Sequence, residues 1–216
     1  CDLEADGLTE TVNLVGDNCH GAVVDVSDRK AVGQWVGAAA SMTGRIDVLV
    51  NNAGGVLGQV GQPLEQVATE EWQAILAVNQ TASFWTSQAV APHMKEAGRG
   101  RIVNISSGAG LGVSKTGIQA YASAKAGQIG LTRQLAHELG PWGITVNNIA
   151  PGFVRSNPNT ERQWDAYGQA GQEDLLSEIA LRRLGTPADI AHSVLFLSSE
   201  YASWITGAVL QVDGGK

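Results

Sequence analysis

Five short apolar runs, each separated from the next by a stretch with helical character, constrain the fold of this 216-residue chain more than any other feature. The runs are rich in Val and Ile, and most lack the polar alternation of a half-exposed strand. Such runs alternating with helices are typical of a parallel sheet covered by helices. We therefore predict one α/β domain over residues 1–216 with a doubly wound, mostly parallel sheet. Its strands are His20–Val26, Ile46–Asn51, Arg101–Ser106, Ile144–Ile149 and Ala208–Val212.

The helices are predicted from capping residues and from the spacing of apolar side chains. We expect them at Asp28 to Met42, Thr69 to Asn79, Thr81 to Ala97, around Tyr121 to Leu139, and Pro187 to Ser198. Residues 153–180 are polar and irregular, so we expect there a non-strand excursion that covers a ligand site. Ligands of open α/β sheets bind at the carboxyl ends of the strands, so the polar or Gly-bearing strand ends predict a cleft there. These ends are Asn51-Asn52-Ala53-Gly54, Ser106-Ser107 and Ala150-Pro151-Gly152.

Tyr121 and Lys125 are four residues apart, which places them on one face of a helix, about one turn from each other. A lysine ammonium beside a phenol favours the phenolate, so we expect the pKa of Tyr121 to fall from about 10 towards neutrality. A phenol of that kind can act as a general acid/base. Ser107 ends a predicted strand and can bind the same substrate oxygen. A serine at that position can also simply cap or turn the chain.

Three further positions have two interpretations from the sequence. Asn79 ends a predicted helix, where Asn is usually a C-cap. Asp25 follows an apolar strand, where Asp is usually a turn or cap residue. Asn51-Asn52-Ala53-Gly54 is either an ordinary strand-to-loop turn or a place where small residues let a flat ligand approach the backbone.

Composition narrows the classes of partner. The net charge is −7 and there is no basic cluster, which argues against nucleic acid and anionic membranes. No apolar run approaches the roughly 18 residues that span a bilayer. The two cysteines and four histidines form no metal-type spacing, so we predict free thiols, a reducing cytoplasm and no metal site. A Gly-x-Ser-x-Gly elbow is missing, so a serine hydrolase is not supported.

Taken together, these residues resemble the short-chain dehydrogenase/reductase family from Cys1 to Lys216, with the motifs in the family's order. The matching motifs are Asp25-Val26, Asn51-Asn52-Ala53-Gly54, Asn79, Ser107, Tyr121 with Lys125, Pro151-Gly152-Phe153-Val154, and Ile205-Thr206-Gly207 through Val212-Asp213-Gly214-Gly215.

The resemblance implies hydride transfer between a nicotinamide and a secondary alcohol or ketone. It makes Tyr121 the acid/base, Lys125 the group that lowers its pKa and bonds the nicotinamide ribose, and Ser107 the holder of the substrate oxygen. It assigns to Asn79 a proton-relay water beside Lys125. The implied cofactor contacts are Asp25, Val26, Asn52, Ala53 and Gly54 on the adenosine side, with Pro151, Gly152 and Val154 along the nicotinamide.

Asp2 favours NAD over NADP as the cofactor. The opening Cys1-Asp2-Leu3 resembles the end of the family's second strand, where an Asp accepts hydrogen bonds from the ribose hydroxyls and repels a 2′-phosphate. No Arg or Lys follows until Arg29. Three alternatives stay open: an exposed Asp without function, an NADP-dependent ketoreductase similar to 3-oxoacyl reductases, and a dinucleotide-fold protein without turnover.

The resemblance also implies a first strand, a glycine-rich turn that holds the pyrophosphate, a helix and most of a second strand ahead of Cys1, about 30–40 residues in all. We expect that the sequence is an incomplete record of the protein. The strands beside the absent one would then be exposed.

Substrate contacts are predicted in the excursion at 153–180 and in the loop before Tyr121. Candidate walls for a small or mid-sized alcohol or ketone are Val113, Ile118, Trp164 and Tyr167. The helices at 81–97 and 119–139 carry more apolar side chains than two solvated helices need. The resemblance implies that they pair across a two-fold axis in a homotetramer.

Overall fold

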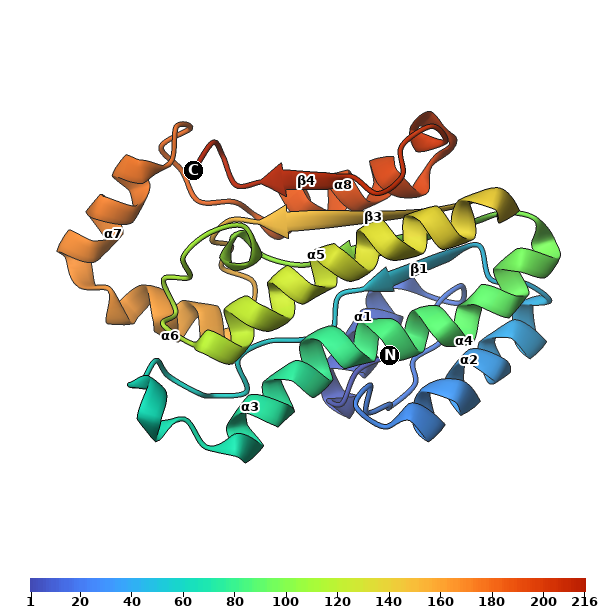
Figure 1. Cartoon of the computed structure of the whole chain (residues 1–216), viewed down its shortest axis with the longest axis horizontal. Coiled ribbons are helices and arrows are strands. Elements are labelled where there is room, and N and C mark those ends of the chain that lie inside the picture. Colours follow the sequence, from blue (N-terminus) through green and yellow to red (C-terminus); the bar gives the residue numbers. More distant parts are fainter.

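A four-stranded parallel sheet lies at the centre of the computed structural model, which describes residues 1–216 (Figure 1). The strands follow one another across the sheet in sequence order, and each neighbouring pair is parallel. They are β1 (Val48–Asn51), β2 (Gly100–Ile105), β3 (Ile144–Pro151) and β4 (Val209–Val212). Each overlaps one of the predicted apolar runs, and the predicted α/β fold is confirmed.

The remaining predicted strand, His20–Val26, does not join this sheet, so that prediction is wrong. Within it only Val23 forms a bridge, parallel to Asp2, with hydrogen bonds from the Asp2 amide to the Ala22 carbonyl (3.2 Å) and from the Val24 amide to the Asp2 carbonyl (2.9 Å). A regular strand needs a continuous ladder, and one bridge does not provide it. β1 is consequently an edge strand. Its alternate side chains Val48 and Val50 are 41 % and 39 % exposed.

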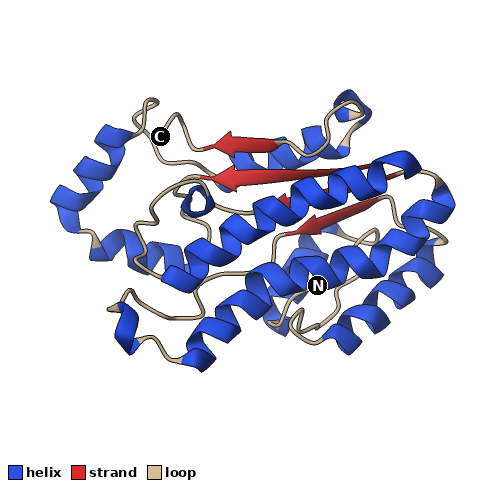
Figure 2. Cartoon of the chain, in the orientation of Figure 1, coloured by secondary structure: helices blue, strands red, loops and turns tan.

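Helices cover both faces of the sheet (Figure 2). α2 (Arg29–Thr43), α4 (Ala82–Ala97) and α5 (Gln119–Leu139) pack on the face that presents Ile102 and Val146. α8 (Pro187–Ser198) packs on the opposite face against Val103 and Ile149. This two-sided burial explains why the runs at β2 and β3 are apolar without alternation.

Most predicted helices are confirmed, and their ends have local causes. The Asp28 carboxylate caps α2 by accepting from the backbone amides of Lys30 and Ala31. Thr186 caps α8, which begins at Pro187. α1 (Ala5–Val15) was not predicted. None of the helices combines the length and the apolar character needed to cross a membrane.

Two predictions about helical segments need correction. Residues 153–180 are largely helical instead of irregular, in α6 (Pro158–Ala166) and α7 (Gly168–Glu178). The overlooked signal is Asn157-Pro158, since the Asn157 side chain caps α6 and Pro is favoured in a first helical turn. Asn79 does not end a helix: α3 (Thr69–Leu76) continues through a π-helical turn, η2 (Ala77–Thr81), into α4.

A buried row of asparagines fixes the carboxyl ends of the strands. Asn51, Asn104 and Asn148 are register partners on β1, β2 and β3. Asn51 Nδ2 donates to Asn104 Oδ1 (2.7 Å), and Asn104 Nδ2 donates to Thr132 Oγ1 on α5 (2.9 Å). Thr86 Oγ1 on α4 donates to Asn51 Oδ1 (2.6 Å). Buried polar groups that are satisfied in this way rigidify their surroundings, so the loops that follow these strands start from a fixed platform.

Candidate active site

The predicted site residues gather where the strands end. Because the strands are parallel, their carboxyl ends lie at one edge, and the arrowheads in Figure 1 point to the side of the molecule where α6 and α7 lie. α5 brings Lys125 to the end of β2, where its Nζ donates to the Ile105 carbonyl oxygen at 2.9 Å. Lys125 is only 4 % exposed.

Tyr121, Lys125 and Ser107 lie together, as the sequence predicted. Lys125 Nζ is 5.7 Å from the centroid of the Tyr121 ring. The Ser107 hydroxyl interacts with the Tyr121 phenol closely enough to lower the pKa of that phenol. The same hydroxyl accepts from the Ala109 amide (3.2 Å), so the interpretation of Ser107 as a cap is also correct.

A close contact of backbones, which the sequence analysis missed, places Ser107 beside α5. The short turn η3 (Gly108–Gly110) follows Ser107. A Cβ atom on Gly110 would lie 2.7 Å from the carbonyl carbon of Lys125 and 2.8 Å from the Ala126 nitrogen. Only glycine permits this approach, and the signal for it was the run Ser107-Gly108-Ala109-Gly110.

The predicted fall in the pKa of Tyr121 is wrong. Burial raises the pKa of the Tyr121 phenol, and the Ser107 hydroxyl offsets only part of that rise. Burial also lowers the pKa of Lys125 to about 8. Attraction between an ammonium and a phenolate would lower the pKa of Tyr121, but removal from water disfavours the charged form of both groups.

Asn79 holds the loop after β1 against the site. Its Oδ1 accepts from the Gly55 amide (3.0 Å), and its Nδ2 donates to the carbonyls of Gly55 (2.8 Å) and Ile75 (2.9 Å). A Cβ on Gly54 would lie 2.6 Å from Asn79 Oδ1 and 3.5 Å from Lys125 Nζ, and Gly54 has φ of +152°. Position 54 therefore requires glycine for both space and backbone conformation.

The residues expected along the nicotinamide lie at the end of β3. The Gly152 amide donates to the Val212 carbonyl (3.0 Å), and a Cβ there would be 2.8 Å from the Asp213 Cα. Val154 forms a parallel bridge with Gly185. Pro151, Gly152 and Val154 thus form one wall of the site at the end of β3, held in place by these contacts with Val212 and Gly185.

The residues expected on the adenosine side are more dispersed. Asn52, Ala53 and Gly54 are exposed in the loop after β1. The Asp25 carboxylate accepts from the amide (2.8 Å) and hydroxyl (2.6 Å) of Ser27, which confirms the turn interpretation of Asp25.

Two other residues on the adenosine side differ in burial. The Val26 side chain belongs to the core beneath α2. Asp2 is exposed, and its Oδ1 accepts from the Glu4 amide (3.2 Å).

The substrate candidates divide into two groups. Phe153, which lies between the wall residues, packs its ring against Trp164 (centroids 6.0 Å apart) and Tyr167 (5.8 Å). Val113 is fully exposed in the loop before α5. Ile118, in contrast, is buried at the start of α5 and offers no open apolar surface.

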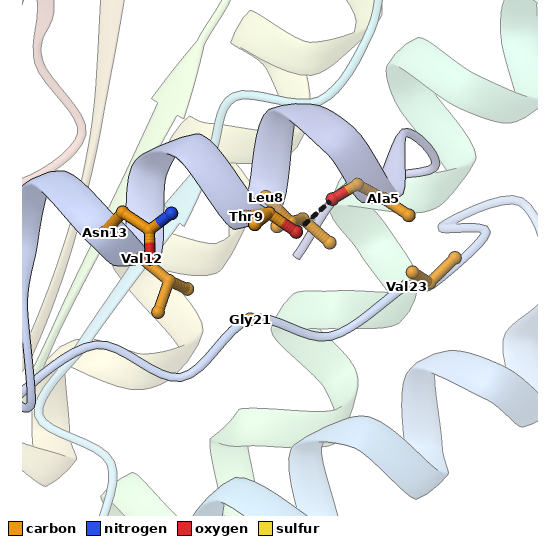
Figure 3. A pocket seen from close by; sticks show the side chains of 7 residues that line it. All are labelled: Ala5, Leu8, Thr9, Val12, Asn13, Gly21 and Val23. Atoms are coloured by element: carbon orange, nitrogen blue, oxygen red, sulfur yellow. Dashed lines mark hydrogen bonds between the residues drawn. The ribbon is translucent and has the colours of Figure 1, made fainter.

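A separate hollow lies between α1 and the segment that contains Gly21 (Figure 3). None of the predicted site residues and no titratable side chain lines it. Its lining residues are Ala5, Leu8, Thr9, Val12, Asn13, Gly21 and Val23.

Comparison with known proteins gives consistent matches over nearly the whole chain. Residues 2–216 match the sequence profile of a family described as "Enoyl-(Acyl carrier protein) reductase". The (2S)-[(R)-hydroxy(phenyl)methyl]succinyl-CoA dehydrogenase subunit BbsD of Thauera aromatica is 41% identical over 218 residues, covering 100% of this chain and 84% of the relative.

Two further relatives are named as a reductase and a dehydrogenase. The 3-oxoacyl-[acyl-carrier-protein] reductase FabG of Thermotoga maritima is 39% identical, covering 98% of this chain and 80% of the relative. The cyclohexanol dehydrogenase of a Rhodococcus species is 34% identical, covering 99% of this chain and 78% of the relative.

Solved structures agree with the fold. A xylitol dehydrogenase with NAD+ bound has a TM-score of 0.91 at 28% identity, covering 99% of this chain and 86% of that chain. ElxO with NADP bound has a TM-score of 0.87 at 31% identity, covering 98% of this chain and 85% of that chain. The two structures carry different nicotinamide dinucleotides.

Proposed function

This chain belongs to the short-chain dehydrogenase/reductase family, and from that premise we propose that Tyr121 is the acid/base of its reaction. The chain is an oxidoreductase that transfers a hydride between a nicotinamide dinucleotide and an alcohol or ketone. The observation that carries the residue assignment is the convergence of Tyr121, Ser107 and Lys125 at the end of β2.

The residues at the strand ends fit a nicotinamide dinucleotide. Gly55 has φ of +145°, and nothing lies within 4 Å of a Cβ built on it, which leaves its backbone open to a flat ligand. The Lys125 ammonium has three N–H groups, and a protein acceptor takes one of them at Ile105, so another is available for a ribose hydroxyl. When bound, the dinucleotide supplies the site that accepts or donates the hydride.

The side chains of this chain then manage the proton. Tyr121 takes the hydroxyl proton when an alcohol is oxidised and returns it when a ketone is reduced. Ser107 donates a hydrogen bond to the same oxygen and stabilises the charge that develops there. Lys125, when protonated, favours the Tyr121 phenolate, and Asn79 holds the Gly54–Gly55 backbone against Lys125 and keeps a water beside it.

We infer NAD as the preferred cofactor, supported by the exposed Asp2 carboxylate. The expected result is that NADH binds the full-length protein at least about tenfold more tightly than NADPH, a difference of about 1.4 kcal/mol. Asp2→Asn should reduce this preference, because it removes the repulsion of a 2′-phosphate. Titration of nucleotide fluorescence measures both constants, and Asp6→Asn on α1 is the matched control.

An NADP-dependent ketoreductase is the second candidate. ElxO holds NADP, and a FabG is among the relatives, which favours this alternative. Tighter binding of NADPH than of NADH by the unmodified protein would establish it and would overturn the role given to Asp2.

The segment 153–180 of this single domain covers the substrate. It lies at the carboxyl-end side of the strands (Figure 1), where Trp164 on α6 and Tyr167 just after α6 pack against Phe153. The substrate is a secondary alcohol or ketone with an apolar body, for which Val113 offers further exposed surface.

The chain assembles as a homotetramer through α4 and α5. Phe84 on α4 is 42 % exposed, and Trp85 is only partly covered by the core. Leu131 on α5 is also partly exposed, and apolar side chains on two neighbouring helices favour pairing with a second copy across a two-fold axis.

A further inference from the structure

Gln128 is a fully buried residue to which the proposed reaction assigns no task. It lies on α5 three residues beyond Lys125 and seven beyond Tyr121, so the three share one helix face. Its exposure is 0 %. A primary amide in full burial needs partners for both its N–H groups and its oxygen.

The nitrogen of the Gln128 amide is satisfied. Nε2 donates to Ser83 Oγ (2.7 Å) and, more weakly, to the Asn79 carbonyl oxygen (3.4 Å). Ser83 Oγ also donates to that carbonyl (3.2 Å). Both lone pairs of the Asn79 carbonyl are therefore in use, and the Asn79 side chain is bonded to Gly55 and Ile75.

The oxygen of the Gln128 amide has no partner in the protein. A buried acceptor left in that condition is destabilising. The buried Lys125 ammonium has more donors than the protein has acceptors for it: it carries three N–H groups, and Ile105 provides one acceptor. Asn79 links the two residues, because its main-chain carbonyl accepts from Gln128 Nε2 and its side chain borders Gly54, where a Cβ would lie 2.6 Å from Asn79 Oδ1 and 3.5 Å from Lys125 Nζ. Residues 125 and 128 are one helical turn apart, so the spare N–H groups of Lys125 and the unpartnered oxygen of Gln128 belong to neighbouring positions on one face of α5.

We propose that Gln128 is a positioning residue for Lys125: an internal water accepts a hydrogen bond from Lys125 Nζ and donates one to Gln128 Oε1. The inference rests on the proposed function in that Lys125 belongs to the active site. It refines the role of Asn79, because Asn79 orients the Gln128 amide while Gln128 Oε1 supplies the acceptor for the water. An internal water typically makes two to four such bonds.

The consequence concerns the charge of Lys125. Tyr121, on the same helix, is the titratable group that faces the ammonium. β2 presents the Ile105 carbonyl, and the loop after β1 presents backbone at Gly54. No carboxylate forms an ion pair with Lys125, and burial alone accounts for its lowered pKa. A water held by Gln128 therefore supports the charged form against desolvation.

The test measures the pKa of Lys125 directly, by NMR of protein labelled at the lysine side chains. The chain has only five lysines, so Lys125→Met identifies the signal. We expect Gln128→Leu to lower the pKa of Lys125 by about one unit, because the water loses its acceptor. Gln128→Glu should raise it, since a carboxylate then faces the ammonium. Gln134→Leu, on the exposed side of α5, is the matched control and should change nothing.

An unchanged pKa of Lys125 in folded Gln128→Leu protein would overturn the proposal. Should that variant fail to fold, a high-resolution crystal structure of the unmodified protein decides, because the water must lie within hydrogen-bond distance of both Lys125 Nζ and Gln128 Oε1. Density that excludes a water there rejects the proposal. Neither measurement requires turnover, so a failure here is distinguishable from a failure of the proposed reaction.

Discussion

Tyr121→Phe is expected to lower kcat by about a thousandfold while nucleotide binding stays within about threefold of the unmodified protein. The substitution removes the phenolic oxygen that exchanges the substrate proton, and positioned acid/base groups contribute about 10²–10⁴-fold to rate. The ring and its packing remain. Steady-state kinetics with a secondary alcohol, together with NADH titration, measure the two effects separately.

Tyr201→Phe is the matched control for this prediction. Tyr201 is 91 % exposed in the short turn after α8 and should tolerate the loss of its hydroxyl. Turnover of Tyr121→Phe within tenfold of the unmodified enzyme would remove Tyr121 from the chemistry.

Lys125→Met is expected to abolish most turnover and, at the same time, to make the protein more stable near pH 7. The pKa of Lys125 is lowered from 10.5 to about 8 by burial, which corresponds to about 3 kcal/mol of unfavourable free energy for the charged form. Methionine removes the buried charge and sacrifices the bond to the Ile105 carbonyl, worth about 1 kcal/mol. The expected gain in the free energy of unfolding is about 2 kcal/mol.

The pH dependence of this gain has a definite sign. The folded pKa lies below the unfolded one, so between pH 8 and 10.5 the unfolded chain binds more protons than the folded protein. This group therefore makes the unmodified protein more stable as pH rises through that window. The advantage of Lys125→Met should be full below pH 8 and should shrink towards pH 10.5.

Denaturant titrations at several pH values measure the stability difference, with Lys30→Met, an exposed lysine on α2, as the control. A variant that is less stable than the unmodified protein at pH 7 would show that the ammonium is better solvated than its burial indicates. Such substitutions, which stabilise a protein while removing its function, are characteristic of active sites.

The sequence predicted those features that depend on local pattern. Val- and Ile-rich runs are apolar because helices cover both sides of β2 and β3, so the pattern located these strands. The four-residue spacing of Tyr121 and Lys125 needs only a helix to become a pair. In contrast, residues 20–26 have the pattern of a strand, but membership in a sheet depends on which neighbour pairs with them.

The features that could not be predicted depend on tertiary contacts. The shifts in the pKa values of Tyr121 and Lys125 follow from burial, which spacing along a helix does not reveal. The π-helical turn at Asn79 and the close approach of Gly110 to α5 both require the partner segment to be in place. The contact of Phe153 with α6 depends on a helix whose capping signal at Asn157 was overlooked.

The most direct test of hydride transfer follows a label from substrate to cofactor. Cyclohexanol and other secondary alcohols, deuterated at the carbinol carbon, are incubated with NAD and the full-length protein, and the nicotinamide is examined by mass spectrometry. We expect deuterium to appear in the NADH formed with at least one alcohol, and to be nearly absent with Tyr121→Phe. The opposite result is a protein that binds NADH while no alcohol in the panel passes its label to the nicotinamide.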